Sequence, residues 1–110
     1  MNFNVVVTDR FKKHAKSIAK KHSSFKSDLE KLIDSLEKNP GQGTPLGKDC
    51  YKVRMAITSK GKGKSGGARV ITCIKKMNRT AYLLAVYDKS KQESISDKKL
   101  DELLHIAGLL

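Results

Sequence analysis

The 110-residue chain has no tryptophan, three phenylalanines, three tyrosines and two cysteines. With so few aromatic side chains, its core must be mainly aliphatic, and a chain of this length is enough for one modest core. We therefore expect a single domain over residues 1–110. Cys50 and Cys73 are too few for a disulfide framework and too far apart for a zinc knuckle, so we interpret them as buried free thiols.

The sequence also lacks an apolar run long enough to cross a bilayer, and its first residues, MNFNVVVTDR, do not have the pattern of a secretory signal. No basic stretch is combined with a large aromatic or leucine-rich face of the kind that inserts into a membrane surface. We therefore expect a cytoplasmic protein that does not bind membranes.

Negative charge is scarce in the middle of the chain, where positive charge is concentrated. The net charge is +12, and residues 41–91 hold twelve Lys and Arg against two Asp and Glu. Residues 92–110, in contrast, hold two Lys and Arg against four Asp and Glu. Because a localised positive field attracts polyanions, the predicted partner is a nucleic acid.

The most basic segment is SKGKGKSGGARVI at residues 59–71, in which lysines alternate with glycines. Glycine lets the backbone approach a ligand closely, and each lysine adds a mobile positive charge. The Gly-x4-Gly-Lys-Ser/Thr frame of a P-loop is missing. We predict a flexible loop at residues 58–66 that binds the phosphates of a nucleic acid. The residues predicted to bind the nucleic acid are Lys60, Lys62, Lys64, Lys75 and Lys91.

The apolar pattern predicts four strands, at residues 3–7, 50–57, 68–75 and 81–87. Helical spacing predicts a hairpin of two helices, the first capped at Thr8 or Asp9 and the second ended by Asn39-Pro40-Gly41. A last helix is predicted at residues 95–110, and residues 41–49 are predicted as a loop. The order β-α-α-β-β-β-α indicates an α+β fold with a small antiparallel β-sheet, an N-terminal helical hairpin and a C-terminal helix, with the helices on one sheet face.

Three segments carry a resemblance to a known family: DCYKVR at 49–54, GGARVI at 66–71 and LLAVYDK at 83–89. In this order and spacing, after the helical hairpin, they resemble the RelE/ParE toxin superfamily, and within it the RelE- and HigB-type mRNA interferases of type II toxin–antitoxin systems. The resemblance implies a ribosome-dependent mRNA endoribonuclease that needs no metal or cofactor. Such a toxin inhibits translation, arrests growth and is neutralised by a cognate antitoxin, so its implied partners are antitoxin, ribosome and mRNA.

A hypothesis about strand register brings basic residues from three strands together. If Arg54 lies opposite Arg69, apolar residues meet on the other sheet face, and Cys50 faces Cys73. Placing Tyr87 opposite Arg69 on the next strand then completes one cluster. A one-residue slip would instead send Tyr87 into the core. The predicted cluster consists of Lys52, Arg54, Arg69 and Tyr87.

RNA cleavage by the 2′-hydroxyl needs a base, a charge that stabilises the phosphorane, and an acid for the leaving oxygen. The histidines, at positions 14, 22 and 105, lie on helices away from the basic strands. Arg54 and Arg69 suit the phosphate charge, and cationic neighbours would favour the neutral form of Lys52, which could then act as the base. The resemblance adds Lys89 as an acid or phosphate clamp and leaves Tyr87 for the role of a family tyrosine.

Alternative interpretations stay open at this point. Lys52 and Arg54 could instead be solvated charges at a sheet edge that prevent aggregation, and Tyr87 could instead be a core residue. For the whole chain, one alternative is a ParE-like inhibitor that binds DNA gyrase by protein–protein contact and cleaves nothing. Another is an RNA-binding module without catalytic activity.

Overall fold

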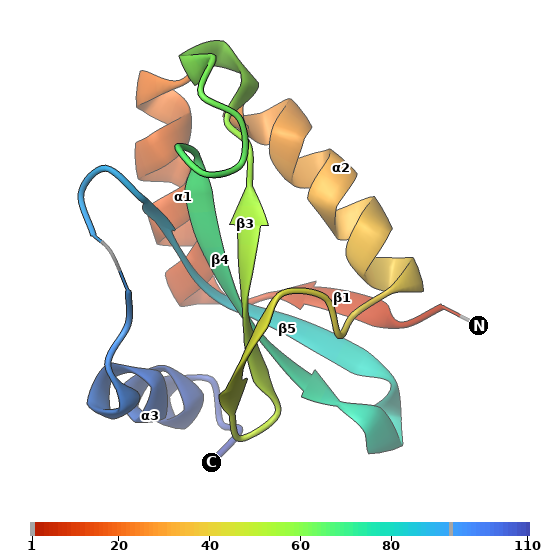
Figure 1. Ribbon diagram of the computed structural model, residues 1–110. Helices are drawn as coiled ribbons and strands as arrows, with labels where there is room; N and C mark the ends of the chain where they lie inside the picture. The colour runs from red at the N-terminus through yellow and green to blue at the C-terminus, as the bar shows by residue number, and fades with distance from the viewer. Residues whose placement is uncertain (1, 93) are drawn as a thin grey trace.

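The computed structural model describes residues 2–92 and 94–110, and Figure 1 shows a twisted sheet with helices around it. The strands are β1 (Asn4–Val7), β2 (Thr44–Gly47), β3 (Cys50–Met55), β4 (Ala68–Lys75) and β5 (Thr80–Asp88). The helices are α1 (Asp9–Lys21), α2 (Phe25–Lys38) and α3 (Asp97–Ile106), with short 3-10 turns η1 (Thr58–Lys60) and η2 (Lys76–Asn78). The predicted α+β class and order of elements are confirmed. Among the described residues, no helix is long and apolar enough to span a membrane.

The sheet has the strand order β1-β5-β4-β3-β2, and two of its features differ from the prediction. Residues 41–49 were predicted as a loop, but part of this segment forms β2, which pairs with β3 at the sheet edge. β2 has no alternating apolar pattern, and its Pro45 is tolerated because an edge strand needs hydrogen bonds on one side only. In addition, β1 pairs with β5 in parallel, so the sheet is mixed.

The α1–α2 hairpin forms where the apolar spacing predicted it. The hydroxyl of Thr8 caps α1 by accepting a hydrogen bond from the backbone N–H of Phe11 at 3.4 Å. α1 buries Phe11, and α2 buries Phe25, Leu32 and Leu36, all in one cluster with the sheet. Each such side chain contributes roughly 1.5–3 kcal/mol through burial, so this cluster attaches the hairpin to the sheet.

The third helix packs on the opposite sheet face, so the prediction that all helices cover one face was wrong. Leu100, Leu103 and Leu104 of α3 form a second cluster with Ile71 and other residues of the face turned away from the hairpin. The reason is visible in β4, which is buried along nearly its whole length because both of its faces are covered. α3 also ends at Ile106 instead of residue 110, and β3 ends at Met55 instead of residue 57.

A β-bulge in β5 decides which way the end of that strand faces. Ile71 of β4 lies opposite Ala85, whereas the next residue, Thr72, lies opposite Leu83, so Leu84 is an extra residue in β5. Leu84 and Ala85, although adjacent in sequence, consequently both contact the α3 cluster. From Ala85 onward the side chains of β5 again alternate between the two sheet faces, which places Tyr87 on the α3 face and not in the hairpin core.

The close approach of β3 and β4 at Gly67 generates a prediction about stability. A Cβ atom at Gly67 would lie 2.1 Å from the carbonyl oxygen of Met55, whereas one at the exposed Gly41 would have its nearest neighbour, the hydroxyl of Tyr51, at 3.9 Å. We expect Gly67→Ala to lower the free energy of unfolding by about 2–3 kcal/mol, because backbone must move to relieve the overlap. Gly41→Ala should change it by less than about 1 kcal/mol. Urea unfolding measures both, and equal midpoints for the two variants would contradict the close packing.

Candidate nucleic-acid interface

The strand register lines up the predicted cluster on the α3 face of the sheet. Arg54 on β3 lies opposite Arg69 on β4, and Arg69 lies opposite Tyr87 on β5. Lys52 lies opposite Ile71, two residues before Arg54 and therefore on the same face. The register hypothesis is confirmed, and side chains directly opposite one another in such a row have Cβ atoms about 4.5–5.5 Å apart. Three cations and a phenol thus come from three neighbouring strands.

The members of this cluster differ in exposure. Arg54 is exposed, and Lys52 and Tyr87 are half-buried. Tyr87 also packs against the α3 cluster, so it has part of the core character that was the alternative interpretation. Arg69 is only 4% exposed. Lys52 and Arg54 are therefore the cluster residues that a large substrate can reach most directly.

The buried guanidinium of Arg69 binds the end of the Lys/Gly loop. Its Nη1 donates hydrogen bonds to the carbonyl oxygens of Lys64 at 3.0 Å and Ala68 at 3.1 Å, and its Nη2 donates to the carbonyl oxygen of Ser65 at 3.0 Å. These bonds leave the N–H on Nε and one N–H on Nη2 without a role in holding the loop. Arg69 therefore fixes the loop to the strand that carries the cluster.

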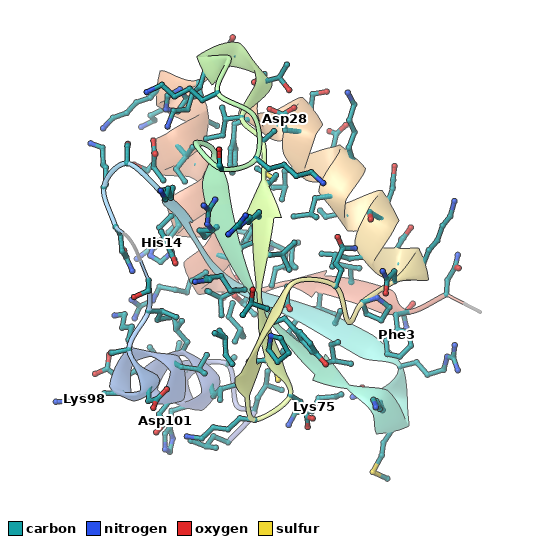
Figure 2. All side chains as sticks on the ribbon, in the orientation of Figure 1. Phe3, His14, Asp28, Lys75, Lys98 and Asp101 are labelled. Atoms are coloured by element: carbon teal, nitrogen blue, oxygen red, sulfur yellow. The ribbon has the colours of Figure 1, made fainter. Side chains whose placement is uncertain are left out.

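A buried carboxylate binds the start of the same loop. Asp28 of α2 accepts hydrogen bonds from the backbone N–H of Thr58 at 2.8 Å and from its hydroxyl at 2.5 Å. Ser24 donates its hydroxyl to Asp28 at 2.8 Å and accepts the backbone N–H of Ser59 at 2.8 Å. Figure 2 labels Asp28 between α2 and the loop. The turn of the helical hairpin thus determines where the loop begins.

A second buried carboxylate, Asp88 at the end of β5, holds the middle of the loop. It accepts a hydrogen bond from the ammonium of Lys60 at 2.9 Å, and both the backbone N–H and the hydroxyl of Ser90 donate to the same oxygen. His22 at the end of α1 lies 3.4 Å from the other carboxylate oxygen. The Lys60 side chain is only 12% exposed, so this lysine is part of a buried ion pair.

The loop at residues 58–66, which was predicted to be flexible, is therefore held by hydrogen bonds at its start and end and by an ion pair at Lys60. Gly61 and Gly63 have φ angles of 71° and 66°, a region that glycine adopts without strain, so these glycines serve the turns of the loop. Lys62 and Lys64 are exposed between the fastened points. Together with Arg54, Lys64 lines a groove of about 310 Å³ beside α2.

Burial alone would raise the pKa of the Asp88 carboxyl, but hydrogen bonds from Lys60 and Ser90 outweigh burial and hold this pKa well below its ordinary value. The same balance applies at Asp28, where burial is outweighed by hydrogen bonds from Thr58 and Ser24, and the pKa is again lowered. Both groups therefore hold the loop as carboxylates at neutral pH.

The remaining predicted residues lie in different places. Lys89 follows β5, and its backbone N–H donates to the carbonyl oxygen of Gly67 at 3.0 Å, next to the loop. Lys91 is exposed on the turn that follows. Lys75 pairs with Thr80 at the other end of β4, six residues and roughly 20 Å from Arg69. The structure brings Lys89 close to the loop and does not bring Lys75 there.

Sequence reasoning did not identify the carboxylates or the histidine that position the loop. Asp28 offered one signal, because it lies on the apolar face of its helix between Phe25 and Leu32, where a charge needs a partner. Asp88 and His22 offered none, since their partners come from distant segments. Among the described residues, no group of His, Cys, Asp or Glu could hold a metal ion.

One family model matches this chain, and solved structures of similar fold are found as well. A family model described as the RelE toxin of the RelE/RelB toxin–antitoxin system matches residues 5–110. An E. coli RelE toxin mutant in the free state has a TM-score of 0.59 and 18% identity, covering 84% of this chain and 90% of that one. A chain of the intact E. coli RelBE toxin–antitoxin complex has a TM-score of 0.61 and 17% identity, covering 78% of this chain and 95% of that one. A chain of a RelBE toxin–antitoxin complex from Mycobacterium tuberculosis has a TM-score of 0.58 and 14% identity, covering 80% of this chain and 92% of that one. A search of curated proteins by sequence finds no match.

The two buried carboxylates generate a prediction about acid stability. Because their pKa values are lowered in the folded protein, they stabilise it above the ordinary aspartate pKa of about 3.9, and this stabilisation is lost as the pH falls through the folded values. We expect unfolding free energy to fall steeply below about pH 4, and Asp88→Asn to reduce that slope by up to about 1.4 kcal/mol per pH unit. Asp34→Asn, at an exposed site on α2, is the control. Equal slopes for both variants in denaturant titrations would contradict the assignment.

Proposed function

Because this chain belongs to the RelE toxin family, we propose that it is the toxin of a type II toxin–antitoxin pair that cleaves mRNA on the ribosome. The observation that supports cleavage most is the row of Arg54, Arg69 and Tyr87 across three strands, with Lys52 on the same face. A scissile phosphodiester is an anion whose charge increases in the transition state, and preorganised cations stabilise that charge. A protein that only binds gyrase does not need such a row.

The proposed reaction begins with the ribose 2′-hydroxyl next to the scissile phosphate. Lys52 acts as the general base that takes the proton from this hydroxyl, and the oxygen attacks phosphorus to form a phosphorane. The exposed guanidinium of Arg54 binds two of the phosphorane oxygens with its planar fork. The 5′-oxygen then leaves with a proton from Lys89 or Tyr87, and the products are a 2′,3′-cyclic phosphate and a 5′-hydroxyl.

Arg69 takes a double role in this proposal. Three of its N–H groups hold the carbonyl oxygens of Lys64, Ser65 and Ala68, which keeps the loop beside the cluster. Arg69 also pairs with Arg54 in the strand register, so its positive charge adds to the potential at the phosphate. Lys62 and Lys64 then bind phosphates on either side of the cleavage point.

The partners follow from the same charge distribution. Ribosomal RNA and mRNA meet a chain with a net charge of +12, and electrostatic attraction speeds their encounter. The cognate antitoxin would offer an acidic segment that folds on binding and competes with RNA for the basic surface. In this proposal the toxin acts in the bacterial cytoplasm.

Variants of the two reachable cations test the cleavage proposal. We expect Lys52→Ala and Arg54→Ala each to lower the rate of mRNA cleavage on ribosomes about 10²-fold or more, because each loses a group that acts on the transition state. Both variants should relieve growth arrest and keep the far-UV circular dichroism of the parent. Lys98→Ala, on exposed α3, is the matched control and should stay toxic. Full toxicity of the two cluster variants would exclude this site.

Induction in cells separates the proposal from gyrase inhibition. An mRNA cutter shuts down translation first and leaves cuts in phase with codons, whereas a gyrase inhibitor first induces the response to DNA damage. Growth arrest that begins with DNA damage and leaves ribosomal mRNA intact would rule out mRNA cleavage.

The loop lysines generate a prediction about salt dependence. If the protein neutralises about six phosphates of a single-stranded RNA, the logarithm of its binding constant should fall with the logarithm of salt concentration at a slope of roughly −4. Replacing both Lys62 and Lys64 with alanine should make this slope shallower by about 1.4. Fluorescence anisotropy with a labelled oligonucleotide measures it, again with Lys98→Ala as the control. An unchanged slope for the double variant would show that the loop does not contact phosphate.

A further inference from the structure

A cavity of about 190 Å³ lies between α1 and the end of β5, on the side of Tyr87 away from the row of arginines. It exists because β1 pairs only with Thr80–Leu83 of β5, so that α1 flanks the rest of the strand. The side chains that matter for its chemistry are His14, Ile18, Lys21, Val86 and Lys91. None of these except Lys91 belongs to the residues predicted from the sequence.

The lining of the cavity combines an apolar wall with an imidazole ring. Ile18 and Val86 supply the wall, and His14, labelled in Figure 2, supplies the ring. The Nδ1 of His14 is buried, so a ligand in the cavity reaches this ring through its other nitrogen, Nε2, which can donate or accept a hydrogen bond. A ring nitrogen beside an apolar wall suits a small ring that has polar groups on its edge.

The rim of the cavity is positively charged. Lys21 and Lys91 lie close enough that the Lys91 ammonium lowers the pKa of Lys21 below its ordinary value. The carboxylate of Asp88 also lines the cavity and attracts the Lys21 ammonium, but it is a single negative charge that Lys60, Ser90 and His22 already bind. An anion placed between Lys21 and Lys91 would relieve their repulsion.

We propose that this cavity binds one nucleotide of the RNA substrate, with the base between Ile18 and Val86, its edge toward His14, and its phosphate between Lys21 and Lys91. The substrate class rests on the proposed function, while the site lies outside the catalytic cluster. The volume of about 190 Å³ is of the size that one nucleobase needs and lies below the roughly 300–1,000 Å³ of pockets for drug-sized ligands. Tyr87 lines the same cavity, so a strand of RNA that enters it continues directly toward the cluster.

The observations favour RNA over an acidic peptide. A carboxylate side chain would engage the cationic rim but would leave the apolar wall and His14 without a ligand group. A nucleotide uses the wall, the imidazole and the rim together, because it joins a flat ring with polar edges to a phosphate. Bases that enter the cavity would hold the RNA in one register relative to the cluster, which makes the pocket a determinant of where cleavage occurs.

Nuclear magnetic resonance on the isolated toxin, without ribosomes, tests this proposal. Uridine and adenosine 5′-monophosphate, inorganic phosphate and glutamate are titrated separately, and the ring ¹⁵N signals of His14 are followed. We expect at least one nucleotide to shift the His14 signals saturably, phosphate to shift only residues of the rim, and glutamate to bind more weakly than the nucleotide. Lys21→Ala should weaken nucleotide binding about tenfold or more, while Lys20→Ala, on the exposed face of the same helix, should not.

Two further variants keep the test independent of catalysis. Followed by the backbone amide signals of Ile18 and Val86, His14→Gln should abolish the response that depends on the base and keep the phosphate response. Lys52→Ala should bind the nucleotide like the parent. Absence of any His14 shift, identical responses to phosphate and nucleotide, or tighter binding of glutamate would each overturn the nucleotide site. Those outcomes leave mRNA cleavage untouched, whereas loss of cleavage with nucleotide binding retained would overturn only the proposed function.

Discussion

The pairing of β4 with its two neighbours is the constraint on which the site depends. Arg69 lies between Arg54 and Tyr87 only because β3 and β5 both pair with β4 in a fixed register. The extra residue Leu84 shifts the pairing of β5 by one residue, so that Tyr87 and not Val86 lies opposite Arg69. Both sheet faces are covered by apolar clusters, so a one-residue slip would place charged side chains in a core. Packing against α1, α2 and α3 therefore stabilises the register, and the register sets the chemistry of the surface.

The second element of the account is how a strongly basic protein holds its basic loop in place. Like charges on neighbouring lysines repel one another, and a loop rich in glycine loses much entropy on ordering. The structure offsets these costs with Asp28 and Asp88, two buried carboxylates that bind the loop from the helical hairpin and from β5. Arg69 holds the end of the loop by donating hydrogen bonds to backbone carbonyl oxygens, so this contact needs no further carboxylate. The exposed lysines keep their charge for a partner, and the loop keeps its position.

The strand register could be predicted from the sequence as a hypothesis, because pairing Arg54 with Arg69 places Val53 opposite Val70 and Met55 opposite Ala68 in the core. The extra residue at Leu84 could not, since a bulge leaves no pattern in a strand that is apolar on both faces. Because the strand is apolar on both faces, the sequence pattern also did not indicate which sheet face α3 covers. The contacts that hold the loop could not be predicted either, because Asp28 and Asp88 bind Thr58 and Lys60, which lie about 30 residues away in the sequence. Long-range polar pairs depend on the completed fold.

The central claim is that an RNA 2′-hydroxyl beside the cationic row attacks the scissile phosphate. The most direct measurement uses ribosomes programmed with mRNA that carries a single 2′-deoxynucleotide at the mapped cleavage position. The account predicts that the all-ribose mRNA yields a 2′,3′-cyclic phosphate end, and that the deoxy substitution abolishes cleavage at this position while binding to the ribosome is unchanged. Cleavage of the deoxy-substituted mRNA at the parental rate would contradict the account, because water or another nucleophile would then be the attacking group.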